Sequence, residues 1–486
     1  MSDEIRALEP TAVWNHFADL NQVPRPSKQE ERVIEFMKSF GESLGLATQV
    51  DAVGNVIIRK PASLGMEDRT PVVLQSHLDM VHQKNAATDF DFLTQGIEMF
   101  IEGDWVKARG TTLGADNGMG VASIMAILAS DEIEHPALEA LFTIDEETGM
   151  TGAQGLEPGL LTGKILLNLD TEEDNELTIG CAGGCNVTSD GSYVPEPTPA
   201  GKAYRLGVRG LTGGHSGVDI HLGRGNANKL MNQLLSGAAL ACDLRVASID
   251  GGGLRNAIPR ESFAVVVVPE SAADEFETLV RASAETIKVA HAATDPDAEI
   301  LLEEVPLPDD VIPREFQKNL LATVHACPCG VYRMSPNIEG LVQTSNNLAR
   351  VQVGDGKVYI GCLTRSSVNS ERDELAAAIK ANFEVLCDDV QVTDPYPGWP
   401  PAPSSAIVTL MSDLYGELFE DEAHVAACHA GLECGIVGRH YPDMDMISFG
   451  PNIRGAHSPD ERVQISSVQK FWKYLLETLR RIPVAA

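Results

Sequence analysis

Apolar runs of strand length alternate with helical segments between residues 71 and 182, and this alternation restricts the chain to a small set of folds. The runs include PVVLQSHLDMV at 71–81, ALEALFTID at 137–145 and KILLNLD at 164–170, with a helical segment beginning at 120 between the first two. Such an alternation is typical of an α/β sheet with helices on its faces. Two helices within 11–45 and a strand pair at about 47–60 are predicted to precede it.

The pattern changes after Gly183, and Pro195, Pro197 and Pro199 mark a linker. Beyond it we expect an α+β region, with strands at 203–210, 261–268 and 357–363 and helices at 226–242, 271–292, 314–326 and 370–386. A second break, PYPGWPPAPSS at 395–405, ends this region, and a helix, a short strand and a terminal helix follow. At 486 residues the chain is too long for one core. We therefore predict a discontinuous domain, 1–185 with 400–486, interrupted by a domain at 186–399.

Composition excludes several classes of partner. The 37 Lys and Arg against 70 Asp and Glu give a net charge of −33, which repels nucleic acid and anionic membranes. The wholly apolar strings are of strand length, and the first residues do not resemble a signal peptide. Nine cysteines, an odd number in a long chain, are typical of reduced thiols. We expect a cytoplasmic protein that binds neither nucleic acid nor membranes.

Side chains that bind metals follow several of the predicted strands. They are His77 and Asp79 in LQSHLDM, Asp116 directly before a helix, the adjacent Glu146 and Glu147, Asp170, and His457 in a late loop. Ligands of open α/β sheets bind where strand ends converge. Each residue alone also has an ordinary explanation, since Asp caps helices and paired Glu residues are common in solvated turns. Together they supply the nitrogen and oxygen ligands preferred by zinc and accepted by manganese or cobalt.

The number of candidate ligands predicts two ions. If Asp116 bridges them, one ion binds His77, Asp116 and Asp170, and the other binds Asp116, Glu147 and His457. Two ions about 3.5–4 Å apart acidify a shared water. Glu146 is then free for proton transfer, and Asp79 orients an imidazole ligand.

Five motifs in order resemble the metal-binding motifs of the M20 metallopeptidases, and most closely those of their aminoacyl-histidine dipeptidase branch. They are HLDMV at 77–81, GADNGMG at 114–120, DEETGMTGA at 145–153, NLDTEE at 168–173 and GAHSPDERV at 455–463. The resemblance implies an α/β fold with a mixed-sheet zinc-peptidase catalytic domain and an inserted α+β lid. It gives the ligands and Glu146 the roles stated above, and it implies a cis peptide bond between Asp116 and Asn117. Many members have a second Asp where this chain has Asn117.

The resemblance also assigns roles to four residues of the lid. His215 in GLTGGHSGVD would stabilise the oxyanion, while Asn256, Arg365 and Gly431 would hold the substrate backbone and its C-terminal carboxylate. A guanidinium suits that task because it binds carboxylates bidentately. The implied protein is a homodimeric dipeptidase that cleaves unblocked dipeptides, including Xaa-His, with a di-metal-activated water and Glu146 as base.

Two rival functions remain at this stage. One is a different M20 activity, such as an amino-acid deacylase or a tripeptidase, with the same metals and another pocket. The other is a non-catalytic binding protein with a decayed site. The second is disfavoured by Glu146, because binding alone needs no spare base beside a ligand.

Overall fold

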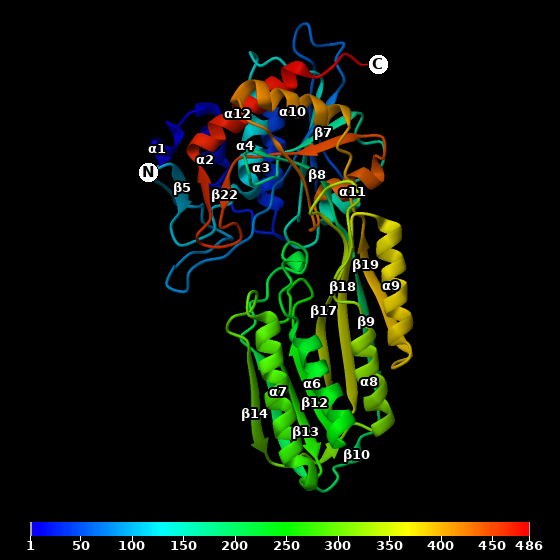
Figure 1. The fold of residues 1–486 in the computed structure, drawn as a ribbon. Helices are drawn as coiled ribbons and strands as arrows, with labels where there is room; N and C mark the ends of the chain where they lie inside the picture. The colour runs from blue at the N-terminus through cyan, green and yellow to red at the C-terminus, as the bar shows by residue number, and fades with distance from the viewer. Residues whose placement is uncertain (1, 486) are drawn as a thin grey trace. The chain divides into compact units, whose positions relative to one another are not determined.

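The computed structural model describes residues 2–485, and the chain forms two compact units (Figure 1). Unit 1 contains the described residues up to Gly180, Pro401–Ala427 and those from Leu432 onward. Unit 2 contains Cys181–Pro400 and Cys428–Gly431. The short segment Cys428–Gly431, which the sequence analysis placed in the discontinuous domain 1–185 with 400–486, groups with unit 2. There the Ala182 amide donates to the Ala430 carbonyl at 2.9 Å.

The main sheet of unit 1 is mixed, as predicted. Its order is β1-β2-β6-β3-β7-β21-β8-β20. The strands are β1 (Ala47–Val50), β2 (Val56–Lys60), β3 (Val72–His77), β6 (Leu138–Thr143), β7 (Ile165–Asn168), β8 (Glu176–Cys181), β20 (His424–Cys428) and β21 (Asp445–Ser448). The central strands β6, β3, β7 and β21 are parallel, and β1, β2 and β8 pair antiparallel. Every residue of β3, β6 and β7 is buried, as parallel strands covered on both faces require.

Eight helices accompany this sheet among residues 2–485. They are α1 (Ser2–Arg6), α2 (Thr11–Leu20), α3 (Glu31–Ser43), α4 (Ala115–Ala129), α5 (Thr151–Gly155), α10 (Ala406–Phe419), α11 (Glu433–His440) and α12 (Ile465–Arg481). Helix α4 contacts β3, α3 contacts β1 and β2, and α10 contacts β21. Thirteen of the fifteen α4 residues are buried, which explains why its apolar residues show no one-sided pattern in the sequence.

A second sheet in unit 1 was not predicted. It has the order β22-β23-β5-β4 and consists of β4 (Met99–Glu102), β5 (Trp105–Ala108), β22 (Ile453–Arg454) and β23 (Arg462–Gln464). Strands of two to four residues are too short to show an alternating pattern. The loop between β22 and β23 carries His457, so this residue follows a strand of the small sheet and not β21 of the main sheet.

Unit 2 contains a larger antiparallel sheet in the order β14-β11-β13-β12-β17-β18-β9-β19, with β16 paired to β17. Its strands are β9 (Gly183–Ser192), β11 (Lys202–Arg209), β12 (Arg245–Gly252), β13 (Ser262–Val268), β14 (Glu299–Val305), β16 (Gly330–Met334), β17 (Val342–Gly354), β18 (Lys357–Ser366) and β19 (Asp389–Tyr396). A two-stranded sheet joins β10 (Glu196–Pro197) and β15 (Asp310–Val311). The α+β character of this region agrees with the predicted lid architecture.

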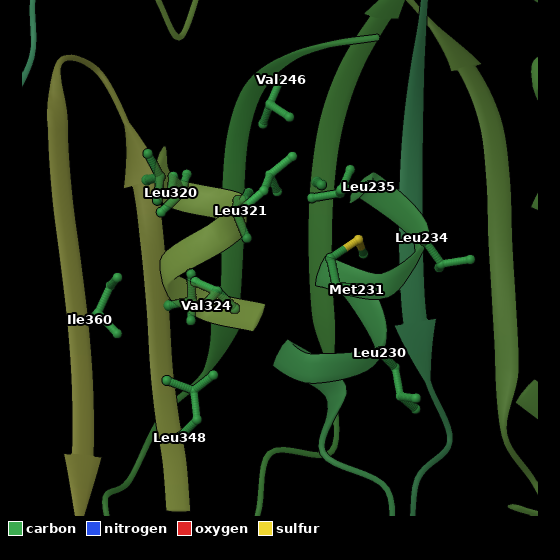
Figure 2. Close-up of a cluster of buried hydrophobic side chains, with 14 of the residues drawn as sticks. Leu230, Met231, Leu234, Leu235, Val246, Leu320, Leu321, Val324, Leu348 and Ile360 are labelled. Atoms are coloured by element: carbon green, nitrogen blue, oxygen red, sulfur yellow. The ribbon is translucent and has the colours of Figure 1, made fainter. Parts of the chain in front are cut away.

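Helices α6–α9 contact the strands of this sheet. Unit 2 contains α6 (Ala227–Cys242), α7 (Ala273–His291), α8 (Arg314–Ala326), α9 (Asn369–Phe383) and the short 3₁₀ helices η1 (Ile220–Leu222) and η2 (Glu270–Ala272). Figure 2 shows part of the core between helices and strands, with side chains from α6 and α8 beside Val246, Leu348 and Ile360. This core is built within unit 2.

Two further features bear on the sequence predictions. No helix within residues 2–485 combines the length and apolar character that crossing a membrane demands. The nine cysteines, all within residues 2–485, stand outside any disulfide, and seven of them are buried.

The two leucines of α6 at positions 235 and 240 form a matched pair for testing the unit 2 core. Leu235 is fully buried, whereas Leu240 is 90% exposed. We expect Leu235→Ala to destabilise unit 2 by about 2–5 kcal/mol because it leaves a cavity. Leu240→Ala should stay within about 0.5 kcal/mol. Urea unfolding followed by circular dichroism measures both, and equal effects would contradict the described packing.

Candidate functional site: a carboxylate and histidine cluster in unit 1

Three neighbouring parallel strands bring predicted site residues together in unit 1. His77 is the last residue of β3, which lies between β6 and β7 in the sheet. Glu146 follows the end of β6 by three residues, and Asp170 follows the end of β7 by two. Because the carboxyl ends of parallel strands meet at one edge of a sheet, these side chains converge there.

His77 contacts two carboxylates through one ring nitrogen. Its Nε2 lies 3.1 Å from Asp116 Oδ1 and 3.5 Å from Asp170 Oδ1. One possible ligand atom from each of the three residues lies within 4.8 Å of those of the other two. His77, Asp116 and Asp170 therefore form a group that could hold a cation.

A second group shares Asp116. His457 Nε2 lies 3.2 Å from Asp116 Oδ2 and 2.9 Å from Glu147 Oε2. The other oxygen of Asp116 faces His77, so this carboxylate presents one oxygen to each histidine. The structure thus brings all five predicted ligands together in two groups with Asp116 in common.

The donor atoms of these groups suit a divalent metal ion. Imidazole nitrogen and carboxylate oxygen are the ligands that zinc accepts, and manganese or cobalt tolerates. Within residues 2–485, Glu147 Oε1 is buried without a hydrogen-bond partner, which is costly for a carboxylate unless a cation satisfies it. The chemistry of the residues present therefore fits a metal ion.

The pKa values in the cluster reflect buried, crowded charge. Burial raises the pKa of Glu146 well above its usual range, and nearby carboxylates including Asp170 add to the rise against the opposing effect of His77. Hydrogen bonds to Asp116 and Glu147 raise the pKa of His457 to about 11. Burial lowers the pKa of His77, but the carboxylates around it outweigh that effect and hold the value well above normal. The carboxylates of the cluster therefore favour positive charge beside them, whether on the two imidazoles or on a bound cation.

Asp79 contacts both His77 and the backbone of the two adjacent glutamates. Its Oδ1 is 3.4 Å from His77 Nδ1 and accepts the Glu146 amide at 3.0 Å. Its Oδ2 accepts the Glu147 amide at 3.3 Å and the Ser27 hydroxyl at 2.8 Å. Asp79 is fully buried, so these contacts fix the ring of His77 and the turn that carries the two glutamates.

The start of α4 has an unusual backbone at Asp116. The peptide bond from Asp116 to Asn117 is cis, which confirms the prediction. Both residues have non-helical dihedral angles, so regular helix begins after Asn117. The Asn117 side-chain amide donates to the Leu169 carbonyl at 2.6 Å, which links this turn to the residue before Asp170.

Three buried charged residues around the cluster were not predicted. Arg25 donates to the carbonyls of Leu78, Asp79 and Gly114, and burial lowers its pKa to about 10. Glu433 accepts hydrogen bonds from Gln75 and Thr143, and burial raises its pKa to about 7. Glu461 accepts hydrogen bonds from the backbone next to Asp116. Arg25 and Glu433 lie outside the metal-type motifs, and Glu461 in GAHSPDERV resembles a surface charge.

Unit 2 contains the remaining predicted residues. Arg365 on β18 is 5% exposed, and its Nη1 donates to the Tyr396 hydroxyl at 2.8 Å. Its Nε is buried without a hydrogen-bond partner within the described residues. Gly217 is close to both side chains, because a Cβ at this position would lie 3.1 Å from His215 Cε1, 3.2 Å from Arg365 Nε and 2.1 Å from the His429 carbonyl oxygen.

Asn256 and Gly431 are located by the backbone segments that carry them. The Asn256 carbonyl accepts the Ser216 amide at 2.7 Å, which ties it to the turn of His215. Gly431 ends the segment that contains His429, a residue the sequence analysis did not single out. Burial lowers the pKa of His429 to about 3, and the charges of Arg365 and His215 add to the effect. The structure therefore gathers basic side chains in unit 2.

Comparison with known proteins gives consistent results. The model of a family described as peptidase family M20/M25/M40 matches residues 73–481. The cytosol non-specific dipeptidase of Escherichia coli is 43% identical over 481 residues, which is 99% of each chain. The crystal structure of aminoacylhistidine dipeptidase from Vibrio alginolyticus is 43% identical, covers both chains completely and has a TM-score of 0.93. Aminopeptidase PepT from Bacillus cereus, at 16% identity and a TM-score of 0.57, shares the fold.

Metal removal provides a test of the cluster. Protein stripped by a chelator should gain thermal stability when zinc or manganese is returned, by about 2.7 kcal/mol at a hundred-fold excess over Kd. Asp116→Ala should bind neither ion because Asp116 belongs to both groups. The exposed Asp413→Ala on α10 is the control. Elemental analysis that finds one ion at full occupancy in Asp116→Ala would show that this residue is not shared.

Proposed function

Because the chain belongs to the peptidase family M20/M25/M40, we propose that it is a metal-dependent dipeptidase that hydrolyses unblocked dipeptides, Xaa-His among them. The observation that carries the proposal is the pair of candidate ligand groups that share Asp116, with Glu146 beside them. The full-length likeness to two proteins named as dipeptidases supports the substrate class.

In this proposal five residues hold two divalent ions. His77, Asp116 and Asp170 hold one, and Asp116, Glu147 and His457 hold the other. Zinc fits this ligand set best, and manganese or cobalt can replace it. When bound, the ions supply Lewis-acid activation of the attacking water and of the scissile carbonyl.

Glu146 is the general base. It takes a proton from the attacking water and delivers it to the leaving amine, which is the role open to a carboxylate beside the ligands that is not itself needed as one. The geometry supports a base beside the ligands, because one carboxylate oxygen of Glu146, one of Glu147 and a ring nitrogen of His77 lie within 4.8 Å of one another. The amides of Glu146 and Glu147 both donate to Asp79, which fixes the turn that carries them. Asp79 is then a positioning residue for the base and for His77.

Unit 2 recognises the rest of the dipeptide. The buried guanidinium of Arg365 has an unpaired Nε, which a C-terminal carboxylate would satisfy with a bidentate contact. His215 stabilises the oxyanion that forms on the scissile carbonyl, and Asn256 and Gly431 bind the substrate backbone. We further propose a cytoplasmic homodimer, in which these residues serve their own subunit or its partner.

One experiment separates this function from its rivals. Metal content is measured together with activity toward dipeptides, N-acylated amino acids and tripeptides. Chelator-sensitive cleavage of dipeptides is the expected result. Preferential cleavage of N-acyl amino acids or tripeptides would redirect the assignment within the family, and metal binding without hydrolysis of any of them would indicate a binding protein.

Substitution of Glu146 tests the base. Glu146→Gln keeps the shape of the side chain but removes the proton acceptor, so kcat should fall by roughly 10²–10⁴ while metal content stays at the wild-type level. Glu147→Gln, at the adjacent position, should instead lose metal. Steady-state kinetics with elemental analysis distinguishes the two, and near-normal kcat in metal-replete Glu146→Gln would refute the assignment.

Amidated substrates test Arg365. A dipeptide amide offers no charge to the guanidinium, and leaving that group unpaired should cost on the order of 2–5 kcal/mol, a loss of about thirty-fold or more in kcat/KM. Arg365→Ala should narrow the gap between acid and amide, chiefly by slowing the acid. Arg350→Ala, on the neighbouring strand β17, is the control. Equal discrimination by wild type and Arg365→Ala would show that Arg365 does not read the carboxylate.

A further inference from the structure

Glu461 is a buried carboxylate that accepts four backbone amides in a row. Its Oε2 accepts from Leu113 at 2.7 Å and Gly114 at 2.9 Å. Its Oε1 accepts from Ala115 at 2.7 Å and Asp116 at 3.2 Å. The residue is 2% exposed, so four contacts satisfy the acceptor capacity of a carboxylate that water scarcely reaches.

These four amides belong to the turn that presents Asp116. Gly114 has a left-handed backbone with φ of 70°, and regular helix does not begin until after Asn117. Amides that precede a regular helix have no carbonyl of an earlier helical turn to donate to. Glu461 supplies the missing acceptors from a segment more than three hundred residues away in sequence.

The same residue anchors the loop of His457. That loop connects β22 and β23, which pair at Arg454 and Arg462. The His457 side chain is 55% exposed and its φ is 64°, so little packing holds it. Four residues later the chain is fixed by Glu461, whose own amide donates to the Ser458 carbonyl at 3.0 Å.

We propose that Glu461 is a positioning residue that ties the His457 loop to the Asp116 turn and thereby sets the affinity for the metal ion held by Asp116, Glu147 and His457. The inference rests on the proposed metal site. Two of that ion's three ligands lie on the segments that Glu461 joins. The other ion shares Asp116 but takes its two further ligands, His77 and Asp170, from the ends of strands β3 and β7, to which none of these four hydrogen bonds of Glu461 is made.

If Glu461 only stabilised the fold, its substitution would lower stability without changing metal affinity. Glu139 is a buried carboxylate that should behave in that way. Glu139 is also a buried carboxylate of unit 1, 5% exposed, whose Oε2 accepts the amides of Thr162 at 2.7 Å and Gly163 at 2.8 Å. It lies on β6, outside both ligand groups. Loss of its charge should lower stability without changing metal affinity.

The test compares Glu461→Gln with Glu139→Gln by titration of the metal-free full-length protein with zinc against a chromophoric chelator. The glutamine amide would face two backbone N–H groups as a donor, so the turn cannot keep all four contacts. We expect Glu461→Gln to weaken one of the two zinc affinities by about 10- to 100-fold, as loss of a ligand-orienting contact does, and the other by less. Glu139→Gln should keep both.

Circular dichroism confirms that each variant is folded. If Glu461→Gln does not fold, Glu461→Asp is measured in the same way, because it keeps the charge and shortens the reach by one methylene. Unchanged zinc affinities in a folded Glu461 variant, or equal losses in Glu139→Gln, would overturn the inference. Wild-type protein that binds no zinc would instead refute the proposed function.

Discussion

The constraint on which unit 1 depends is the burial of several carboxylates in one small volume. Asp116, Glu146, Glu147 and Asp170 lie at the end of the parallel strands, and burial together with mutual repulsion raises the pKa of the last three. Bringing like charges together out of water is costly unless cations or donors offset them. The two histidines supply part of the compensation, and backbone amides supply more. A divalent ion at each group would offset the remaining repulsion between these carboxylates. Metal binding should therefore also stabilise the fold around the cluster.

Beneath the candidate ligands, polar side chains form a hydrogen-bonded row across the sheet. Gln75 on β3 and Thr143 on β6 both donate to Glu433, at 2.6 and 2.7 Å. Asn168 on β7 donates to Gln75, and Ser448 on β21 donates to Asn168. Gln75 precedes His77 by two residues, and Asn168 precedes Asp170 by two, so the row fixes the strands directly before they deliver their ligands. Buried polar networks of this kind specify one arrangement of neighbouring strands, which a site of several ligands requires.

The sequence predicted the parts of this site that follow from local pattern. Apolar runs ending in His77 or Asp170 locate a strand and its terminus together. Strand β17 was missed because its buried positions include Gln343 to Asn347, a polar stretch without apolar alternation. Arg25 and Glu461 were missed for a different reason. Their importance comes from contacts with backbone groups distant in sequence, and nothing in the neighbouring residues distinguishes either from a solvated surface charge. Local sequence pattern therefore predicts the candidate metal ligands better than it predicts the residues that fix the position of those ligands.

The candidate site residues of the two units differ in chemistry, in a chain whose net charge is −33. Unit 1 concentrates carboxylates suited to cations, while unit 2 concentrates Arg365, His215 and His429 around Gly217. Burial and the charge of Arg365 lower the pKa of His215, so that imidazole favours its neutral form, and the guanidinium remains the principal positive charge. A buried cation with an unpaired Nε binds an anion more strongly than a neutral group, because the carboxylate both neutralises the charge and satisfies the donor. On the proposed function, this asymmetry selects peptides with a free C-terminus.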